Sequence, residues 1–453
     1  MHVVQQPGAP VQFAEFDREL LARLSCPGPR HSWYPGPERF GADFGYRDYL
    51  QAVAALRTRG SARPLALYLH LPFCEAQCQD GPCGNIVSLK RGKAAVYLSY
   101  LKREIEMQGL LFAGINQVGQ LHLGGITPAC LPAAQMQELM LHLRHCFQFA
   151  GDEQGEYQIE VDPDSTTPQD VASLRGLGFN HISLNLRADG LHYGAHATDA
   201  ILAAAREAQF RSLSINLLCG VPEHDLGALT STLATVTAAA PDRVTLCQGA
   251  RPGQLFAPSC AMLELCIDTL GKAGYVHIGM DHFARAGDSL AVAHAQGRLH
   301  RNFHGYSTHA DADLVACGVS AISAVGSTYS QNVKTLDAYY DLIDSNELPI
   351  ERGIRLSMDD VLRRTIIQQL MCQFELSIPS IEQAFPIDFA QYFAAELPRL
   401  EQLARDGLVQ IEPQWLSVTP SGRIRLREVC SVFDRYQHGA GAAPSPARGA
   451  PAI

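Results

Sequence analysis

The chain lacks three features that would assign it to a membrane, an export route or a nucleic acid. No uninterrupted apolar run reaches about 18 residues, so no transmembrane helix is expected. The N-terminus, Met1–Pro7, has no basic region followed by an apolar stretch, which argues against a secretory signal there. Lys and Arg number 36 against 46 Asp and Glu, and this net charge of −10 argues against non-specific nucleic-acid binding.

A regular disulfide framework is also missing. The 13 cysteines of the 453-residue chain follow no repeating spacing, which indicates the reduced thiols of a cytoplasmic protein. Apolar residues make up 47% of the chain, enough for the core of one large α/β domain and a smaller second one.

From residue 66 to about residue 280, strand and helix patterns alternate at intervals of roughly 30 residues. This alternation predicts a parallel sheet with crossover helices. The predicted strands are 65–71, 120–123, 157–161, 182–186, 213–219 and 243–247, and the predicted helices include 97–111, 135–146, 200–209 and 226–239.

A different pattern begins after about residue 345. Ser357 caps a predicted helix over 357–373, which has two acidic residues in its first turn, and 397–406 predicts another helix. Two short strand patterns and a last helix follow, which is a winged-helix-like order. Residues 350–436 contain 10 basic and 12 acidic residues, so the basic footprint of a nucleic-acid-binding module is missing and a packing or lid domain is expected.

The expected division has four parts. They are an N-terminal extension with one helix at 49–57 (1–60), a barrel (61–345), a C-terminal helical domain (346–437) and a disordered tail rich in Ala, Gly and Pro (438–453).

Three cysteines follow the strand pattern at 66–73. Cys74, Cys78 and Cys83 lie within ten residues, and thiolates are the ligands that iron–sulfur clusters and zinc prefer. Three such ligands leave one metal position open for chemistry. The spacing alone leaves three alternatives: an iron–sulfur cluster, a structural zinc site with His70 as fourth ligand, or unrelated buried thiols.

The run Tyr68–Cys78 resembles the opening of the radical S-adenosylmethionine (SAM) motif of the oxygen-independent coproporphyrinogen III oxidase family. The resemblance is collinear from about residue 15 to about residue 437. It implies an α/β fold: a partial (β/α)6 radical-SAM barrel with an N-terminal extension and a C-terminal, mainly helical, winged-helix-like domain. The other segments that carry it are 28–35, 124–128, 160–163, 279–284, 300–303 and 318–323.

Departures from the family pattern gather at the positions that the resemblance assigns to the cluster and to SAM. Gly81 stands where the family has its third cluster cysteine, and the next thiol is Cys83. Ile126 replaces a glycine of the family's turn, and Asn216 replaces an aspartate. Arg187 stands in place of a neutral amide, and a fixed cation near the positive sulfonium of SAM predicts weaker binding.

The resemblance implies a [4Fe-4S] cluster held by Cys74 and Cys78, with Cys83 as a displaced third ligand. It implies that SAM is bound by Tyr68, Gly124, Gly125, Thr127, Glu160, Arg187, Asn216, Ala250 and Ile322. A tetracarboxylate porphyrinogen would face His282, His300, Arg301 and His304, since the planar fork of arginine binds two carboxylate oxygens at once. The alternative for these last four is that they are ordinary surface or capping groups.

The implied reaction is the oxygen-independent oxidative decarboxylation of coproporphyrinogen III to protoporphyrinogen IX, a radical SAM step of haem biosynthesis, carried out by a cytoplasmic monomer. A tetrapyrrole is the expected ligand, whereas the sequence does not indicate the electron donor. The departures favour an alternative, a non-catalytic porphyrin- or haem-binding paralogue that has lost radical generation. A zinc-stabilised structural protein is a third hypothesis. Fold resemblance alone does not choose among them, because function depends on the site.

Overall fold

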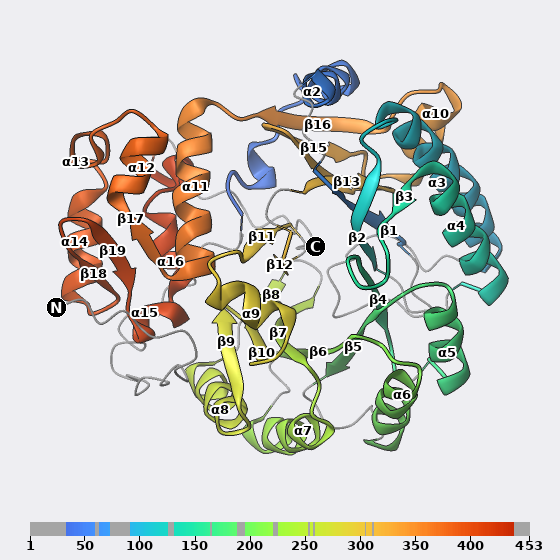
Figure 1. The fold of residues 1–453 in the computed structure, drawn as a ribbon, viewed down its shortest axis with the longest axis horizontal. Coiled ribbons are helices and arrows are strands. Elements are labelled where there is room, and N and C mark those ends of the chain that lie inside the picture. The colour runs from blue at the N-terminus through green and yellow to red at the C-terminus, as the bar shows by residue number, and fades with distance from the viewer. Residues whose placement is uncertain are drawn as a thin grey trace.

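A computed structural model describes the following residues of the chain: 33–58, 63–72, 91–125, 131–163, 165–187, 195–220, 225–251, 254–256, 259–303, 305–309 and 312–438. A curved 14-stranded sheet with helices on its outside forms the larger part, and a smaller, mainly helical body lies beside it (Figure 1). This confirms the predicted fold class. None of the helices in these ranges has the length and apolar character that a membrane crossing needs.

Six neighbouring parallel strands form the barrel, and they correspond to the six predicted ones. They are β1 (Leu65–His70), β2 (Gln117–Gly124), β4 (Glu156–Val161), β5 (His181–Arg187), β6 (Ser212–Cys219) and β7 (Arg243–Arg251). The crossover helices are α3 (Arg91–Leu111), α4 (Ala133–Cys146), α5 (Pro168–Gly176), α6 (Ala195–Glu207) and α7 (Leu226–Ala239), and Figure 1 shows them along the outside of the sheet.

Further strands extend the sheet at both ends, and the barrel does not close. The strand that pairs with β1 is parallel to it, whereas the strands beyond it and those next to β7 are antiparallel. Next to β1 lie β13 (Asp313–Cys317), β14 (Ile322–Val325), β15 (Thr328–Asn332) and β16 (Ile350–Arg355). Next to β7 lie β10 (His282–Arg285) and β9 (Tyr275–Gly279), and β9 and β16 are the two edges. The hairpin β11 (His300–Asn302)–β12 (Gly305–Ser307) contacts the C-terminal helix α11 (Met358–Gln373), which also contacts β9.

The remaining elements before the C-terminal body are short or lie on the periphery. The helix predicted at 49–57 is confirmed as α2. These elements are η1 (Pro37–Arg39), α2 (Tyr46–Thr58), β3 (Gln148–Phe149), β8 (Gln254–Phe256), α8 (Cys260–Lys272), α9 (Ser289–Ala295) and α10 (Leu336–Asp344).

The C-terminal body begins with α11, whose start the sequence specifies locally. The Ser357 hydroxyl accepts from the Asp360 backbone N–H, and the Asp360 carboxylate accepts from the Ser357 N–H, a capping box. The body then contains α12 (Ile378–Ala384), α13 (Phe389–Tyr392), α14 (Leu397–Arg405), α15 (Pro420–Ile424), α16 (Leu426–Ser431), α17 (Arg435–His438) and a small antiparallel sheet of β17 (Glu375–Ser377), β19 (Trp415–Val418) and β18 (Val409–Ile411).

The two faces of the barrel sheet differ in polarity. Residues in register on neighbouring strands share a face. Tyr68 is in register with His122, Asn216 with Thr245, and Thr245 with His282, so these side chains belong to the inner face. The alternate positions supply the main core under the helices: Leu67, Leu121, Ile159, Leu184, Ile215 and Val244. The inner face is therefore the polar surface on which a site can be built.

Candidate active site on the inner face of the barrel

Strand β1 places Tyr68 and His70 on the inner face. The Tyr68 hydroxyl lies 3.2 Å from Nδ1 of His70, and their rings stack with centroids 6.2 Å apart. Tyr97 of α3 donates from its hydroxyl to the carbonyl oxygen of His70 at 2.7 Å. Burial lowers the pKa of His70 to about 4, so its imidazole is neutral at pH 7. The strand that leads to the cysteine cluster thus ends in a fixed, uncharged histidine.

A histidine–carboxylate pair lies next to this strand. Nε2 of His122 on β2 is 3.1 Å from Oε1 of Glu160 on β4, and the His122 ring meets the Tyr68 ring edge-on, with centroids 5.5 Å apart. Burial raises the pKa of Glu160, but hydrogen bonds from His122 and Asn185 outweigh burial and hold it below its usual range. The Glu160 side chain is 24% exposed, so an anionic carboxylate is available to a ligand on the inner face.

The turn after β2 requires glycine at two consecutive positions. Gly125 has φ +81°, and a Cβ there would lie 2.9 Å from the Leu71 carbonyl oxygen and 3.1 Å from Cε1 of His70. A Cβ on Gly124 would lie 2.9 Å from the Tyr68 hydroxyl. The backbone of this turn therefore packs directly against Tyr68, His70 and Leu71, and glycine at both positions permits that close packing.

A neutral amide pair continues the inner face on β5 and β6. Nδ2 of Asn216 donates to Oδ1 of Asn185 at 2.9 Å. The same Asn185 helps to hold Glu160 ionised. The substitution of an aspartate by Asn216, noted in the sequence, thus leaves Glu160 without a second carboxylate at this position.

A buried carboxylate on α3 connects the barrel to the strands that extend it beyond β1. Glu104 of α3 has no exposed surface and accepts hydrogen bonds from the Gly318 N–H at 2.7 Å, the Asn332 amide at 2.8 Å and the Tyr339 hydroxyl at 2.6 Å. These donors belong to the turn after β13, to β15 and to α10. The network fixes the turn that leads into β14, where Ile322 lies.

Glu104 is a buried polar residue that was not predicted from the sequence. Its signal was a carboxylate within the apolar stripe of the predicted helix 97–111, three residues after Leu101 and one before Ile105, both of which are fully buried. A charged residue in such a stripe must find partners, because an unpaired buried carboxylate costs free energy.

A second polar group lies where the barrel meets the C-terminal body. Asp281 accepts from Arg427 of α16 at 2.6 Å. His282 follows at the start of β10, and its ring meets the Tyr306 ring edge-on at 5.1 Å. The guanidinium of Arg301 lies over the same Tyr306 ring, 4.6 Å from its centroid. The structure therefore brings together His282 and Arg301, two of the four residues that the sequence assigned to the porphyrinogen.

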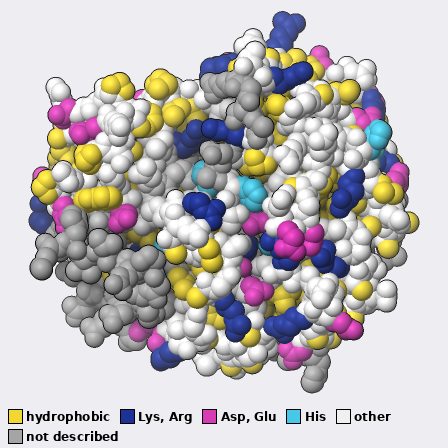
Figure 2. Space-filling view, viewed as in Figure 1, with side chains coloured by type: hydrophobic (Ala, Val, Ile, Leu, Met, Phe, Trp, Pro, Cys, Tyr) yellow, Lys and Arg dark blue, Asp and Glu magenta, His cyan; other side chains and the backbone are white. Residues whose placement is uncertain are grey.

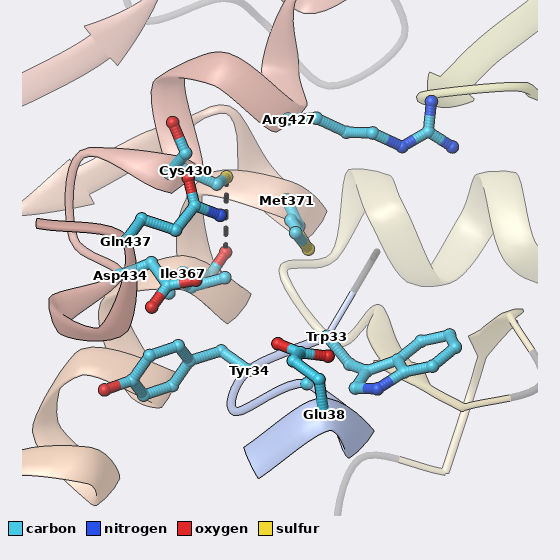
Figure 3. A pocket seen from close by; sticks show the side chains of 11 residues that line it. Trp33, Tyr34, Glu38, Ile367, Met371, Arg427, Cys430, Asp434 and Gln437 are labelled. Carbon is cyan, nitrogen blue, oxygen red and sulfur yellow. Dashed lines mark hydrogen bonds between the residues drawn. The ribbon is translucent and has the colours of Figure 1, made fainter. Parts of the chain in front are cut away.

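A cleft shares one residue, Arg427, with this group. It lies between residues 33–38 and the C-terminal body, and its lining includes Trp33, Glu38, Met371 and Arg427 (Figure 3). Arg427 lines the cleft and also forms the ion pair with Asp281.

Comparisons with known proteins identify the family. The HemN C-terminal domain model matches residues 356–425. The chain is 38% identical to the oxygen-independent coproporphyrinogen III oxidase of Pseudomonas aeruginosa, over 93% of this chain and 96% of that one. It is 40% identical to the oxidase of the same name from Escherichia coli, over 94% and 96% of the two chains. The chain belongs to the oxygen-independent coproporphyrinogen III oxidase family.

The family assignment extends to the tertiary structure. The solved structure of coproporphyrinogen III oxidase (HemN) from Escherichia coli, a radical SAM enzyme, matches with a TM-score of 0.84 at 39% identity. The match covers 92% of this chain and 98% of the E. coli oxidase.

The SAM positions carried over from the oxidase family are only partly described. Six of them lie in described segments, and Ile322 packs in the same buried cluster as Tyr68. These six are Tyr68, Gly124, Gly125, Glu160, Asn216 and Ile322. Arg187 and Ala250 lie in β5 and β7, but their side chains are outside the described part, as is all of Thr127. That these residues bind SAM stays a prediction.

The predicted metal site cannot be built from the described residues. Cys74, Cys78 and Cys83 lie outside them. Within the described ranges, no three His, Cys, Asp or Glu side chains gather as a metal site would require. Of the predicted porphyrinogen contacts, His300 lies on β11, half-buried, and His304 lies outside the described residues.

Proposed function

We propose that this chain catalyses the oxygen-independent oxidative decarboxylation of coproporphyrinogen III to protoporphyrinogen IX, with SAM and a [4Fe-4S] cluster as cofactors. The observation that supports this best is the ionised Glu160, held by His122, on the same inner face as Tyr68 and beside the bare Gly124–Gly125 turn. A partly exposed, ionised carboxylate suits a ligand with an ammonium group, as the methionyl part of SAM has.

The described residues fit SAM by their chemistry. The Glu160 carboxylate would accept from the ammonium group of the methionyl part. We assign the cluster to Cys74, Cys78 and Cys83. When bound, the cluster and SAM supply the radical that removes hydrogen from a propionate side chain. The protein then has to bind, orient and shield the substrate.

One residue favours a second candidate, a tetrapyrrole-binding paralogue without radical chemistry. Gly81 replaces the thiol that would be the third cluster ligand. Iron–sulfur clusters are held by thiolates, so a missing ligand weakens cluster assembly unless Cys83 takes its place. The names of the relatives do not favour this candidate, since the Pseudomonas aeruginosa and Escherichia coli relatives are both called oxidases.

Metal analysis separates the two candidates. After anaerobic reconstitution we expect about four irons and four sulfides per chain, with an EPR signal of the reduced protein that SAM perturbs. Cys83→Ser should abolish this signal. Cys146→Ser, which alters a half-buried thiol at the end of α4, should leave it unchanged. No cluster, or a cluster indifferent to SAM, would rule out radical catalysis and leave the tetrapyrrole-binding candidate.

The finer assignments follow from the same proposal. We expect a tetrapyrrole substrate, a cytoplasmic location and a monomer. Light scattering after gel filtration tests the last of these, because a monomer has the chain mass of 49.3 kDa and a dimer twice that mass.

A further inference from the structure

Arg301 of β11 is a buried cation whose guanidinium is incompletely paired. The residue is only 8% exposed, and neither Nε nor Nη1 has a hydrogen-bond partner in the part of the chain that the structure describes. Its backbone is nevertheless fixed by one side chain: the Arg301 N–H donates to Oε1 of Gln368 at 3.3 Å, and Nε2 of Gln368 donates to the Arg301 carbonyl oxygen at 2.6 Å. A buried charge without its full set of hydrogen bonds destabilises the folded protein. A ligand that supplies those hydrogen bonds can offset this cost.

The guanidinium is also held in a defined orientation. It lies over the Tyr306 ring, 4.6 Å from the centroid, and the Tyr306 hydroxyl donates to the Met371 carbonyl oxygen at 2.9 Å. The ring of His282 meets the same tyrosine edge-on, and its Nδ1 is buried without a partner in the described residues. Two unpaired polar side chains from different strands therefore share one aromatic platform.

The charges around this platform do not cancel. Asp281 is already paired with Arg427 at 2.6 Å, so the two arginines and one carboxylate leave one net positive charge. Burial, followed by the nearby Arg301, lowers the pKa of His282 to about 3, so the imidazole is neutral at pH 7 and carries one N–H. A cation beside a neutral donor suits an anion that accepts several hydrogen bonds.

The platform faces the same interior as the candidate SAM site. His282 is in register with Thr245, which is in register with Asn216, so the inner face is continuous from one group to the other. Figure 2 shows histidine and basic side chains gathered in the middle of this face of the molecule, over β11 and β12.

We propose that Arg301 and His282 form a carboxylate-binding site that holds one propionate of the porphyrinogen, other than the propionate that reacts. This inference rests on the proposed function, because that function supplies the tetracarboxylate. The planar guanidinium of Arg301 binds the two carboxylate oxygens side by side, and the imidazole of His282 adds a third hydrogen bond. The ring of Tyr306 keeps the guanidinium in this orientation. Such an anchor would set which edge of the macrocycle points toward the SAM site.

Binding of a porphyrin to the full-length protein tests the site without the cluster or SAM. The probes are coproporphyrin III, which has four free carboxylates, and its tetramethyl ester, which has none, both titrated by fluorescence. Arg301→Gln should raise the Kd for coproporphyrin III by about 10- to 100-fold, as expected for a lost charge-assisted pair. It should leave the Kd for the ester unchanged, and Arg301→Lys should fall between parent and Gln.

A matched control removes a different arginine. Arg175 pairs with Asp152 at 2.8 Å on the surface, so Arg175→Gln should leave both affinities unchanged. The melting temperature of ligand-free Arg301→Gln should equal or exceed that of the parent, because the substitution removes an unpaired buried charge.

Each adverse result has a distinct meaning. Equal affinities of parent and Arg301→Gln for coproporphyrin III would overturn the site and leave the proposed function standing. An equal loss of affinity for the tetramethyl ester, or a clear fall in melting temperature, would mark Arg301 as structural and overturn the site too. Failure of the parent to bind coproporphyrin III would instead count against the proposed function.

Discussion

Replacing Glu104 by Gln should flatten the dependence of stability on pH between about pH 5 and about pH 8. Burial raises the pKa of Glu104 to about 7, although hydrogen bonds from Tyr339, Gly318 and Asn332 act in the opposite direction. In the unfolded chain the pKa of a glutamate side chain is about 4.3. A carboxyl whose pKa is higher in the folded state stabilises the fold fully below the unfolded pKa, and this contribution is lost as the pH rises through the folded value.

The size of the effect follows from that difference. At about 1.4 kcal/mol per pH unit, a gap of about 2.7 units corresponds to about 3.7 kcal/mol in full, of which about 2.6 kcal/mol falls between pH 5 and pH 8. Glu104→Gln has no proton to lose, so this part of the decline should vanish. The glutamine amide also faces donors, so the variant will be less stable at pH 5, and the readout is the difference between the two pH values rather than either stability alone.

Urea unfolding followed by circular dichroism at pH 5 and pH 8 measures this difference. Glu138→Gln is the control, because Glu138 is 62% exposed in its pair with Lys102, so its removal should leave the pH dependence almost unchanged. If Glu104→Gln and the parent lose the same free energy of unfolding between the two pH values, the reasoning about the buried network is wrong.

Three further substitutions test the candidate site. Gly81→Cys restores a thiol at the third ligand position, so iron retained per chain after exposure to air should rise, and unchanged iron would contradict the role given to position 81. Gly125→Ala should cost about 2–4 kcal/mol, since φ is +81° and its Cβ would lie 2.9 Å from a carbonyl oxygen, whereas Gly151→Ala, with nothing within 4 Å, should cost little in a thermal melt. Glu160→Gln should weaken SAM binding about tenfold or more in calorimetry, because it removes the anion that His122 holds; equal affinity would exclude that contact.

Local signals were sufficient for much of the fold. The alternation of strand and helix patterns predicted all six barrel strands, because each pattern depends on residues that are near one another in sequence. Ser357 predicted the start of α11 for the same reason, since a capping box involves only four consecutive residues. The motif around Tyr68 indicated the family, and the comparisons confirmed it.

The sequence by itself therefore determined the order of elements, the parallel sheet and the family of this protein. Only the tertiary structure decided which charges are paired. Glu104 meets donors more than 200 residues away, whereas Nε and Nη1 of Arg301 have no hydrogen-bond partner among the residues that the structure describes. Such pairings depend on strand register and on the packing of segments that are distant in sequence. Local sequence patterns do not predict them, because the partners become neighbours only when the chain has folded.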